Sequence, residues 1–210
     1  PQSLETLIIP YAEISNDGLA NIPKNVTHLD LHRNYYISDE GIANLPPNLT
    51  YLDIHTSSLS LDGVKDLPST ITHLNVHHAE LEPECAQYLP RNLNYLDAAN
   101  ACFDDTSLKD LPSNLTYLDI SCSEITDDGL DYLGDNIISL NLHYDNSITN
   151  EGIKKLPSKL EELDLHWNQT LTEVCISHLP NSLNWLDISF VELSDNYTQS
   201  LPENLIYLDI

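Results

Sequence analysis

The sequence predicts a right-handed α/β solenoid in which a parallel β-sheet lines the concave face and short helices line the convex face. One phrase returns along the chain every 22 or 23 residues, and a fixed period of this length is typical of repeat proteins. Each period joins a strand pattern to a short helix pattern, which makes a right-handed crossover unit. Stacked units bury one continuous core. The leucine that marks each repeat is found at Leu7, Leu29, Leu52, Leu74, Leu96, Leu118, Leu140, Leu163, Leu186 and Leu208.

The repeats extend over residues 1–210, so we expect a single domain of about nine and a half repeats. A chain of this length could hold one or two domains, but no Gly/Ser-rich linker or shift in composition divides it. Solenoids need atypical capping units at their ends, and we recognise none in this sequence. We therefore expect the chain to be a piece of a longer protein.

Each repeat is expected to begin with a strand and to end with a brief helix. In the strand at residues 115–121, Leu115, Leu118 and Ile120 are the positions that face the core. Good N-cap residues are expected to start the helices that follow the strands, with acidic residues in the first turn; they are Ser15, Ser38, Thr126, Thr149 and Ser194. A typical helical segment is predicted from Asp127 to Leu133. Proline ends this segment in eight of the nine copies, since it cannot continue a helix.

The repeated phrase L-x-x-L-D-L-x-x-N, followed by [I/L]-[T/S]-D-x-G-[L/I]-x-x-L, resembles the leucine-rich repeat family. It is found in residues 160–168 and 125–133. The D-x-G-L part resembles the cysteine-containing and ribonuclease-inhibitor-like subclasses, and L-P-x-N-L-x-x-L-D resembles repeats of bacterial effector proteins. The resemblance implies a leucine-rich repeat solenoid of horseshoe shape that captures a protein on its concave face.

One feature of the sequence departs from the family pattern. The asparagine that the family buries in the turn after the strand is present only as Asn34 and Asn168. We expect looser or water-filled turns where it is replaced. The replacements are Ala12, Ser57, Ala79, Ala101, Ser123, Asp145 and Val191.

Three columns of side chains are expected on the concave face, because strand side chains alternate. We number the first leucine of the strand as position one. The aromatic column at position three holds Thr6, His28, Tyr51, His73, Tyr95, Tyr117, Ser139, Glu162, Trp185 and Tyr207. The acidic column at position five holds Ile8, Asp30, Asp53, Asn75, Asp97, Asp119, Asn141, Asp164, Asp187 and Asp209. The histidine column at position seven holds Pro10, His32, His55, His77, Ala99, Ser121, His143, His166 and Ser189.

The acidic column should carry repulsion between neighbouring carboxylates. Adjacent strands lie about 4.8 Å apart, so the repulsion is roughly 1 kcal/mol per solvated pair. We expect Asn75 and Asn141 to relieve part of it, and we expect the pKa values of several Asp and several His residues to rise together. The alternative is that the acidic column is an ordinary solvated position of the strand, in which amides and water bridge the carboxylates.

The charge of the chain indicates which partners it favours. Its formal net charge is -25, from 33 acidic and 8 basic residues. Nucleic acids and anionic membranes are disfavoured, because both require a basic surface. A protein partner with a basic surface fits better, although acidic residues could also serve solubility alone. We expect a monomer.

The candidate partner-binding residues lie on the concave face and concentrate toward the C-terminal end. Exposed aromatic residues beside charges are typical interface anchors. Four of them are expected to cluster near the C-terminal end: Tyr144, Trp167, Trp185 and Phe190. The ten candidates are Tyr95, Tyr117, Asp119, Tyr144, Asp164, His166, Trp167, Trp185, Asp187 and Phe190.

Catalysis and metal binding are not predicted. His32, His55 and His77, with Asp30 and Asp53, offer suitable metal ligands, but a sheet splays such side chains in parallel. No nucleophile motif or phosphate-binding glycine loop is present. We therefore expect no metal, no cofactor and no enzymatic activity.

The sequence analysis thus favours a protein-binding module. The resemblance of the repeats to those of bacterial effector proteins suggests an effector that an intracellular bacterium delivers into the host cytoplasm. The alternative is the substrate-recognition arm of a ubiquitin ligase, with an F-box-like or catalytic segment outside this chain.

The four cysteines have no C-x-x-C spacing, and reduced thiols suit a cytosolic environment.

Overall fold

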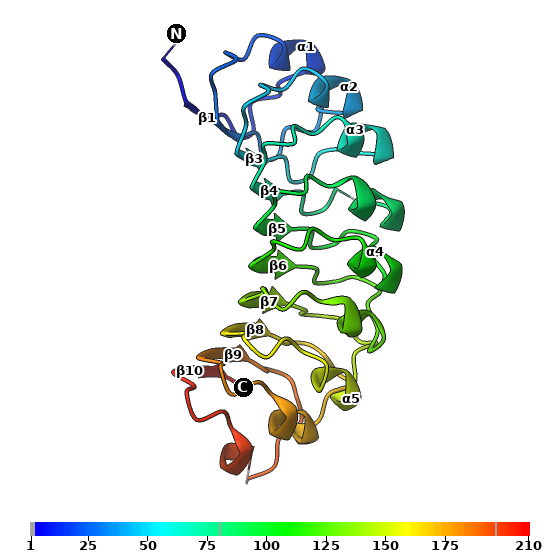
Figure 1. The fold of residues 1–210 in the computed structure, drawn as a ribbon, viewed down its shortest axis with the longest axis vertical. Helices are drawn as coiled ribbons and strands as arrows, with labels where there is room; N and C mark the ends of the chain where they lie inside the picture. The colour runs from blue at the N-terminus through cyan, green and yellow to red at the C-terminus, as the bar shows by residue number, and fades with distance from the viewer. Residues whose placement is uncertain (1–2, 80, 196) are drawn as a thin grey trace.

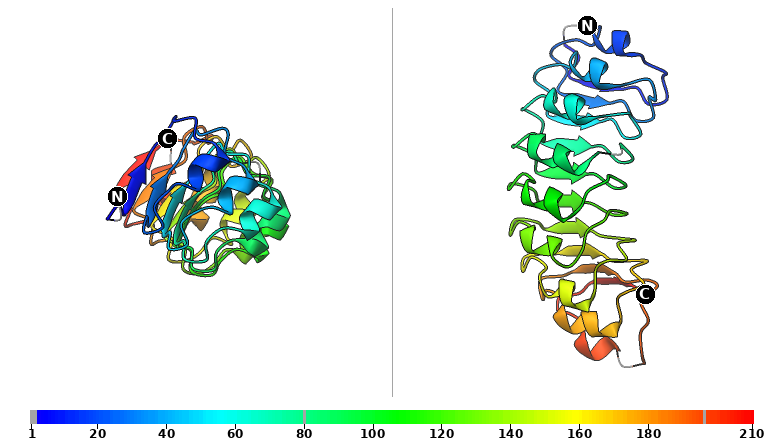
Figure 2. Two further views of the ribbon diagram at one scale, coloured as in Figure 1. Left: turned by 90° about the horizontal axis from the view of Figure 1, so that it is seen from above. Right: turned by 90° about the vertical axis from the view of Figure 1, so that its right-hand side faces the viewer.

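The computed structural model describes residues 3–79, 81–195 and 197–210, which form a gently curved rod of two layers. Ten parallel strands form one sheet in sequence order. The strands follow the concave edge and the helices follow the convex edge (Figure 1). The view along the rod in Figure 2 places the two layers on opposite sides. The predicted α/β solenoid is confirmed.

The strands are three residues long and the helices contain four to six residues. The strands are β1 (Thr6–Ile8), β2 (His28–Asp30), β3 (Tyr51–Asp53), β4 (His73–Asn75), β5 (Tyr95–Asp97), β6 (Tyr117–Asp119), β7 (Ser139–Asn141), β8 (Glu162–Asp164), β9 (Trp185–Asp187) and β10 (Tyr207–Asp209). The α-helices are α1 (Asn16–Leu19), α2 (Asp39–Ile42), α3 (Leu61–Lys65), α4 (Asp105–Lys109) and α5 (Asn150–Ile153). The 3-10 helices are η1 (Pro83–Tyr88), η2 (Gly129–Tyr132), η3 (Glu173–His178) and η4 (Tyr197–Ser200). Within the described residues, no helix has the length and apolar character needed to cross a bilayer.

The leucine at position four sets the register of the whole sheet. Leu118 pairs with Leu96 on one side and with Leu140 on the other, and all three are at most 1% exposed. The first and last leucines of the series, Leu7 and Leu208, are only partly buried. Because side chains alternate along a strand, burial of position four turns positions three and five outward. The predicted register is confirmed.

The helical segment predicted from Asp127 to Leu133 is shorter in the structure and is a 3-10 helix, η2. Its N-cap is Asp128 rather than the predicted Thr126. The Thr126 hydroxyl nevertheless accepts the backbone N–H of Asp128 at 3.2 Å, as a capping side chain does, and it also donates to Asp105 Oδ2 of the preceding repeat at 2.6 Å. The prediction for Thr149 is confirmed, because its side chain accepts the backbone N–H of Glu151.

Ser15 and Ser38 do hold the N-cap positions of α1 and α2, but neither makes a side-chain capping hydrogen bond. The Ser38 hydroxyl accepts a hydrogen bond from Asn16 of the preceding repeat. The Ser194 backbone N–H donates to Glu173 of the preceding repeat. At Ser38, a contact between repeats has replaced the expected cap within a repeat.

A ladder of hydrogen bonds joins the starts of consecutive helices on the convex side. Asp127 accepts the backbone N–H of Thr149 at 2.7 Å and its hydroxyl at 2.6 Å. Asp105 and Thr126 form the same pair of bonds. A methyl group at Gly129 would lie 2.2 Å from Asp105 Oδ1. The glycine of the D-x-G phrase therefore leaves room for the carboxylate of the preceding repeat.

Replacement of Gly129 by Ala is expected to destabilise the chain by about 2 kcal/mol, because the Asp105 carboxylate must move and its bonds to Thr126 weaken. Urea denaturation followed by circular dichroism measures this loss. Gly134→Ala is the matched control, since no heavy atom lies within 4 Å of the added methyl group. A loss for Gly129→Ala no larger than that of the control would contradict this explanation.

Buried polar atoms without a hydrogen-bond partner among the described residues occur at three turns that lack asparagine and also at the asparagine-containing turn of Asn168. Asn34 accepts two backbone N–H groups and donates to the carbonyls of Ile9 and Leu31. At the equivalent positions, Ser57 Oγ, Ser123 Oγ and Asp145 Oδ2 are buried without a hydrogen-bond partner among the described residues. Whether water fills these turns stays a prediction.

Candidate functional site

The outward-facing side chains of the sheet form the predicted columns on the concave face. Positions three and five pair with their counterparts across every adjacent pair of strands from β1 to β10. Tyr117 lies opposite Ser139, for example, and Asp119 lies opposite Asn141. The columns are therefore continuous surfaces that several repeats build together.

The acidic column also has a structural role that the sequence analysis missed. In eight repeats the Oδ1 atom at position five accepts the backbone N–H of position seven at 2.9–3.2 Å. Asp and Asn both favour this local bond. The Asn75 and Asn141 amides also donate to Asp53 and Asp119, which confirms the predicted relief of repulsion. The recurring sequence D-x-[H/S] could have indicated this hydrogen bond between positions five and seven.

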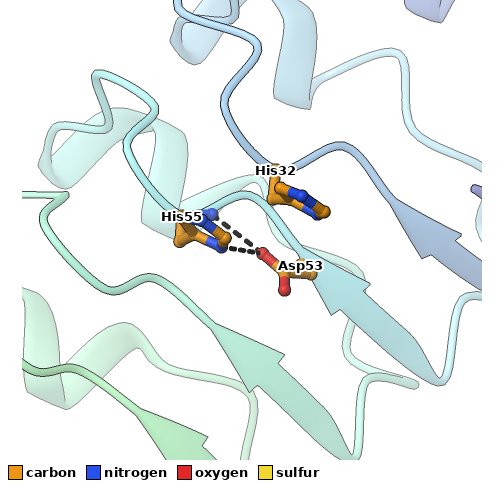
Figure 3. Close-up of side chains that lie close together, drawn as sticks. All are labelled: His32, Asp53 and His55. Carbon is orange, nitrogen blue, oxygen red and sulfur yellow. Dashed lines mark hydrogen bonds and ion pairs between the residues drawn. The ribbon is translucent and has the colours of Figure 1, made fainter. Parts of the chain in front are cut away.

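Histidines at position seven pair with the carboxylate two residues earlier. His Nδ1 lies 2.6–2.8 Å from Asp Oδ1 in the pairs Asp30 with His32, Asp53 with His55, and Asp164 with His166. Figure 3 shows the His32 ring beside the His55 ring and the Asp53 carboxylate directed at His55. The centroids of the two rings are 4.9 Å apart, and those of His143 and His166 are 4.5 Å apart.

Two groups of these residues have the donor types for a metal ion, with ligand atoms within 4.8 Å of one another. They are His32 with Asp53 and His55, and His143 with Asp164 and His166. In each group one carboxylate already bonds a His Nδ1. A metal would have to compete with the proton of that bond. The expectation of no metal stays a prediction.

The expected joint rise of Asp and His pKa values is correct for one Asp of the column and wrong for two His residues. Burial, followed by the nearby Asp119 carboxylate, raises the pKa of Asp97 to about 6. Burial lowers the pKa values of His77 and His143. Desolvation of the imidazolium outweighs the attraction of the carboxylates, so both rings favour the neutral form.

Rings of the aromatic column stack from strand to strand over the N-terminal half of the sheet. The centroid distances are 3.8 Å for His28–Tyr51, 6.2 Å for Tyr51–His73, 5.6 Å for His73–Tyr95 and 4.0 Å for Tyr95–Tyr117. Ser139 and Glu162 then interrupt the series, and stacking resumes between Trp185 and Tyr207 at 5.4 Å. The aromatic column thus consists of two stacks with a gap between them.

A second set of aromatic rings lies at position eight, directly after the histidine column. Tyr144, Trp167 and Phe190 are 52%, 40% and 63% exposed. Their rings follow one another at centroid distances of 6.2 and 4.4 Å. We call these three residues the aromatic row.

The backbone of the aromatic row adopts the left-handed conformation, with φ values of 61°, 61° and 70°. This conformation is unfavourable for bulky side chains. In this conformation the Tyr144 and Trp167 N–H groups donate to the carbonyls of His166 and Ser189 in the next repeat. Three large, exposed rings thus occupy positions where glycine or asparagine would be less strained.

The structure divides the predicted aromatic binding residues among three places: Tyr95 and Tyr117 lie in the N-terminal stack of the aromatic column. Tyr144, Trp167 and Phe190 are adjacent, but the Trp185 ring stacks with Tyr207 of the aromatic column instead. The predicted cluster of four aromatic residues is therefore divided between two columns.

The polar candidates differ in how far they reach solvent. His166 contacts Asp164 and lies 3.9 Å from Asp187. Asp119 is only 7% exposed and accepts bonds from Ser121 and Asn141. Ser121 is completely buried. The register predicted how these side chains are directed but not how deeply they lie.

Comparison with known proteins supports the repeat architecture. A family model described as leucine-rich repeat matches residues 23–45 and 112–134. No curated protein matches the chain. The structure of the leucine-rich repeat-containing protein LegL7 from Legionella pneumophila aligns with 95% of this chain and 89% of its own, with a TM-score of 0.56 and 17% identity. A chain of the Rad7 and Elc1 complex in yeast aligns over 99% of this chain and 70% of its own, with a TM-score of 0.63 and 19% identity.

Proposed function

Because this chain is a leucine-rich repeat protein, we propose that it is a protein-binding module that holds a basic segment of its partner on the concave face. The observation that carries the proposal is the aromatic row, which follows the acidic and histidine columns in the same repeats. Three exposed rings in contact present a large apolar area, and large aromatic anchors dominate many protein interfaces. The carboxylates of the acidic column, three residues earlier in the repeat, favour a basic partner.

The strain of the aromatic row supports a binding role. Each ring occupies a left-handed position, where a bulky residue costs about 1 kcal/mol relative to glycine or asparagine. Side chains that are exposed and strained contribute little to folding. Retention of such residues is more readily explained by contact with a partner.

Replacement of Trp167 and Phe190 together by Asn is expected to abolish partner capture without loss of stability. Asn tolerates the left-handed conformation, so the free energy of unfolding should stay the same or rise by about 1 kcal/mol. Capture from cytosolic extract, compared between wild type and variant by mass spectrometry at low and high salt, measures the binding. Proteins that bind through the acidic face should be lost at high salt.

The matched control is the pair Arg33→Asn and Thr56→Asn, at the same left-handed position of two N-terminal repeats. This pair should leave capture unchanged. Equal capture by wild type and by the Trp167/Phe190 variant would reject the aromatic row as the binding site.

We further propose that the module is an effector that works in the cytosol of a host cell. The similar fold of LegL7 from Legionella pneumophila supports this setting. Burial raises the pKa of Cys85 to about 11 and that of Cys175 to about 12, so both thiols stay protonated and react little at neutral pH.

The second candidate is the substrate-recognition arm of a ubiquitin ligase. Similarity to a chain solved within the Rad7 and Elc1 complex favours a place in a multi-protein assembly. The complete gene tests this candidate. A catalytic or F-box-like segment beside the repeats would favour the recognition arm, and a gene without one would favour the effector that acts by binding alone.

A further inference from the structure

A depression of about 220 Å³ opens on the concave face at the gap in the aromatic column. Tyr117 on β6 and Trp185 on β9 form its two ends, and Ser139 and Glu162 occupy position three on the strands between them. Asp164 also lines it. We call this depression the slot.

Both ends of the slot present the face of an aromatic ring. Tyr117 stacks on Tyr95 with a centroid distance of 4.0 Å and an angle of 5° between the rings. Trp185 stacks on Tyr207 at 5.4 Å and 2°. Each ring thus has a neighbour on its outer side, and its inner side is turned toward the gap. Three strand steps separate the two rings, or about 14 Å.

The slot is also strongly acidic. The Glu162 side chain is exposed, and its carboxylate has no hydrogen bond or ion pair among the residues that the structure describes. Asp164 uses Oδ1 to accept from His166. No Lys or Arg occupies position three, five or seven in any repeat. A cation that enters the slot therefore meets negative charge without a competing basic residue in the columns.

We propose that the slot binds an arginine side chain of the protein partner, an inference that rests on the proposed function. A guanidinium plane over Ser139 continues the stack of rings on Tyr117 and lies next to the Glu162 carboxylate. Arginine combines stacking on an aromatic face with bidentate bonding to a carboxylate. A lysine ammonium provides the charge without the plane, and an aromatic ring provides the plane without the charge.

The test uses the peptide acetyl-Gly-Arg-Gly-amide and its counterparts with Lys or Phe in place of Arg. Nuclear magnetic resonance follows the indole N–H of Trp185 during titration, at a salt concentration that screens the general acidity of the chain. We expect the arginine peptide to bind at least about tenfold more tightly than the other two. Equal binding of the lysine peptide would overturn the proposal, as would preferred binding of the phenylalanine peptide.

Two variants of the slot separate its shape from its charge. Ser139→Tyr fills the gap without a change of charge, and Glu162→Gln removes the charge without a change of shape. Each should weaken binding of the arginine peptide about tenfold. Thr6→Tyr, at position three of β1, and Asp62→Asn, on α3 at the convex side, are the matched controls and should bind as wild type does. Wild-type affinity in Glu162→Gln would overturn the proposal even where Ser139→Tyr fails to fold.

The outcomes also distinguish this inference from the proposed function. Absence of arginine binding, with partner capture still dependent on Trp167 and Phe190, would overturn the slot and leave the protein-binding role in place. Arginine binding at the slot, with capture independent of Trp167 and Phe190, would uphold the slot and reject the aromatic row as the site.

Discussion

Asp145→Asn is expected to stabilise the folded chain by about 4 kcal/mol at pH 8 and by at most about 1 kcal/mol at pH 5. Asp145 stands where Asn34 and Asn168 stand in their repeats, and it is 1% exposed. Burial raises its pKa to about 8. Its Oδ1 accepts the Ser123 N–H at 3.0 Å, and its Oδ2 has no partner among the described residues.

The sign of the pH dependence follows from proton binding in the two states. The folded chain keeps the proton on Asp145 up to about pH 8, whereas the unfolded chain releases it near the ordinary value of 3.8. The protonated carboxyl therefore contributes most to stability below pH 3.8, and this contribution is lost as the pH rises through about 8. The slope is at most about 1.4 kcal/mol per pH unit. Asn has no proton to lose, so its advantage grows with pH.

Urea denaturation of wild type and variant at pH 5 and pH 8 measures the difference. Asp135→Asn is the control, because Asp135 is exposed and should change stability little at either pH. A gain for Asp145→Asn that is equal at the two pH values would show that Asp145 does not titrate between them.

The repeat leucines made the fold predictable from the sequence. Leu29 and its counterparts recur at the period of one strand and one crossover, and burial of this residue in every internal strand fixes the register. The direction of each outward side chain follows from that register, so the columns were predicted residue by residue. Local alternation and a fixed period are properties that a single sequence contains.

The conformation of position eight could not be predicted in the same way. Glycine and asparagine usually signal a left-handed residue, but this position holds Arg33, Thr56, Cys122 and Trp167, among others. In the repeats before the last turn, the N–H at position eight donates to a carbonyl of the next repeat in this conformation, as Trp167 does to Ser189. A contact between repeats therefore overrides local preference, and the local sequence gives no sign of it.

The burial of side chains on the concave face could also not be predicted from the sequence. His77 and His143 were expected to gain protons from nearby carboxylates, but burial lowers their pKa values instead. Trp185 was grouped with Trp167 because the two lie in adjacent repeats near the C-terminal end, yet it joins the stack that contains Tyr207. Both errors concern how side chains pack against neighbours from other repeats.

The reverse substitution, Asn34→Asp, is expected to destabilise the chain by about 4 kcal/mol at pH 8 and by about 2 kcal/mol at pH 5. Asn34 is completely buried, and its amide donates to the carbonyls of Ile9 and Leu31 at 2.9 and 2.8 Å. A carboxylate would leave both carbonyls without their donor and would place its charge against them. At pH 5 the protonated acid can restore one of the two bonds.

Urea denaturation at both pH values tests this expectation, with Asn136→Asp as the control because Asn136 is exposed and makes a single hydrogen bond to Ser113. The buried substitution should reverse the pH trend of Asp145→Asn, since it adds a group of raised pKa where the other removes one. A loss below about 1 kcal/mol at pH 8 would mean that the turn can open and hydrate the carboxylate. In that case the turns that naturally lack asparagine would also be hydrated, and the large effect expected at Asp145 would shrink with it.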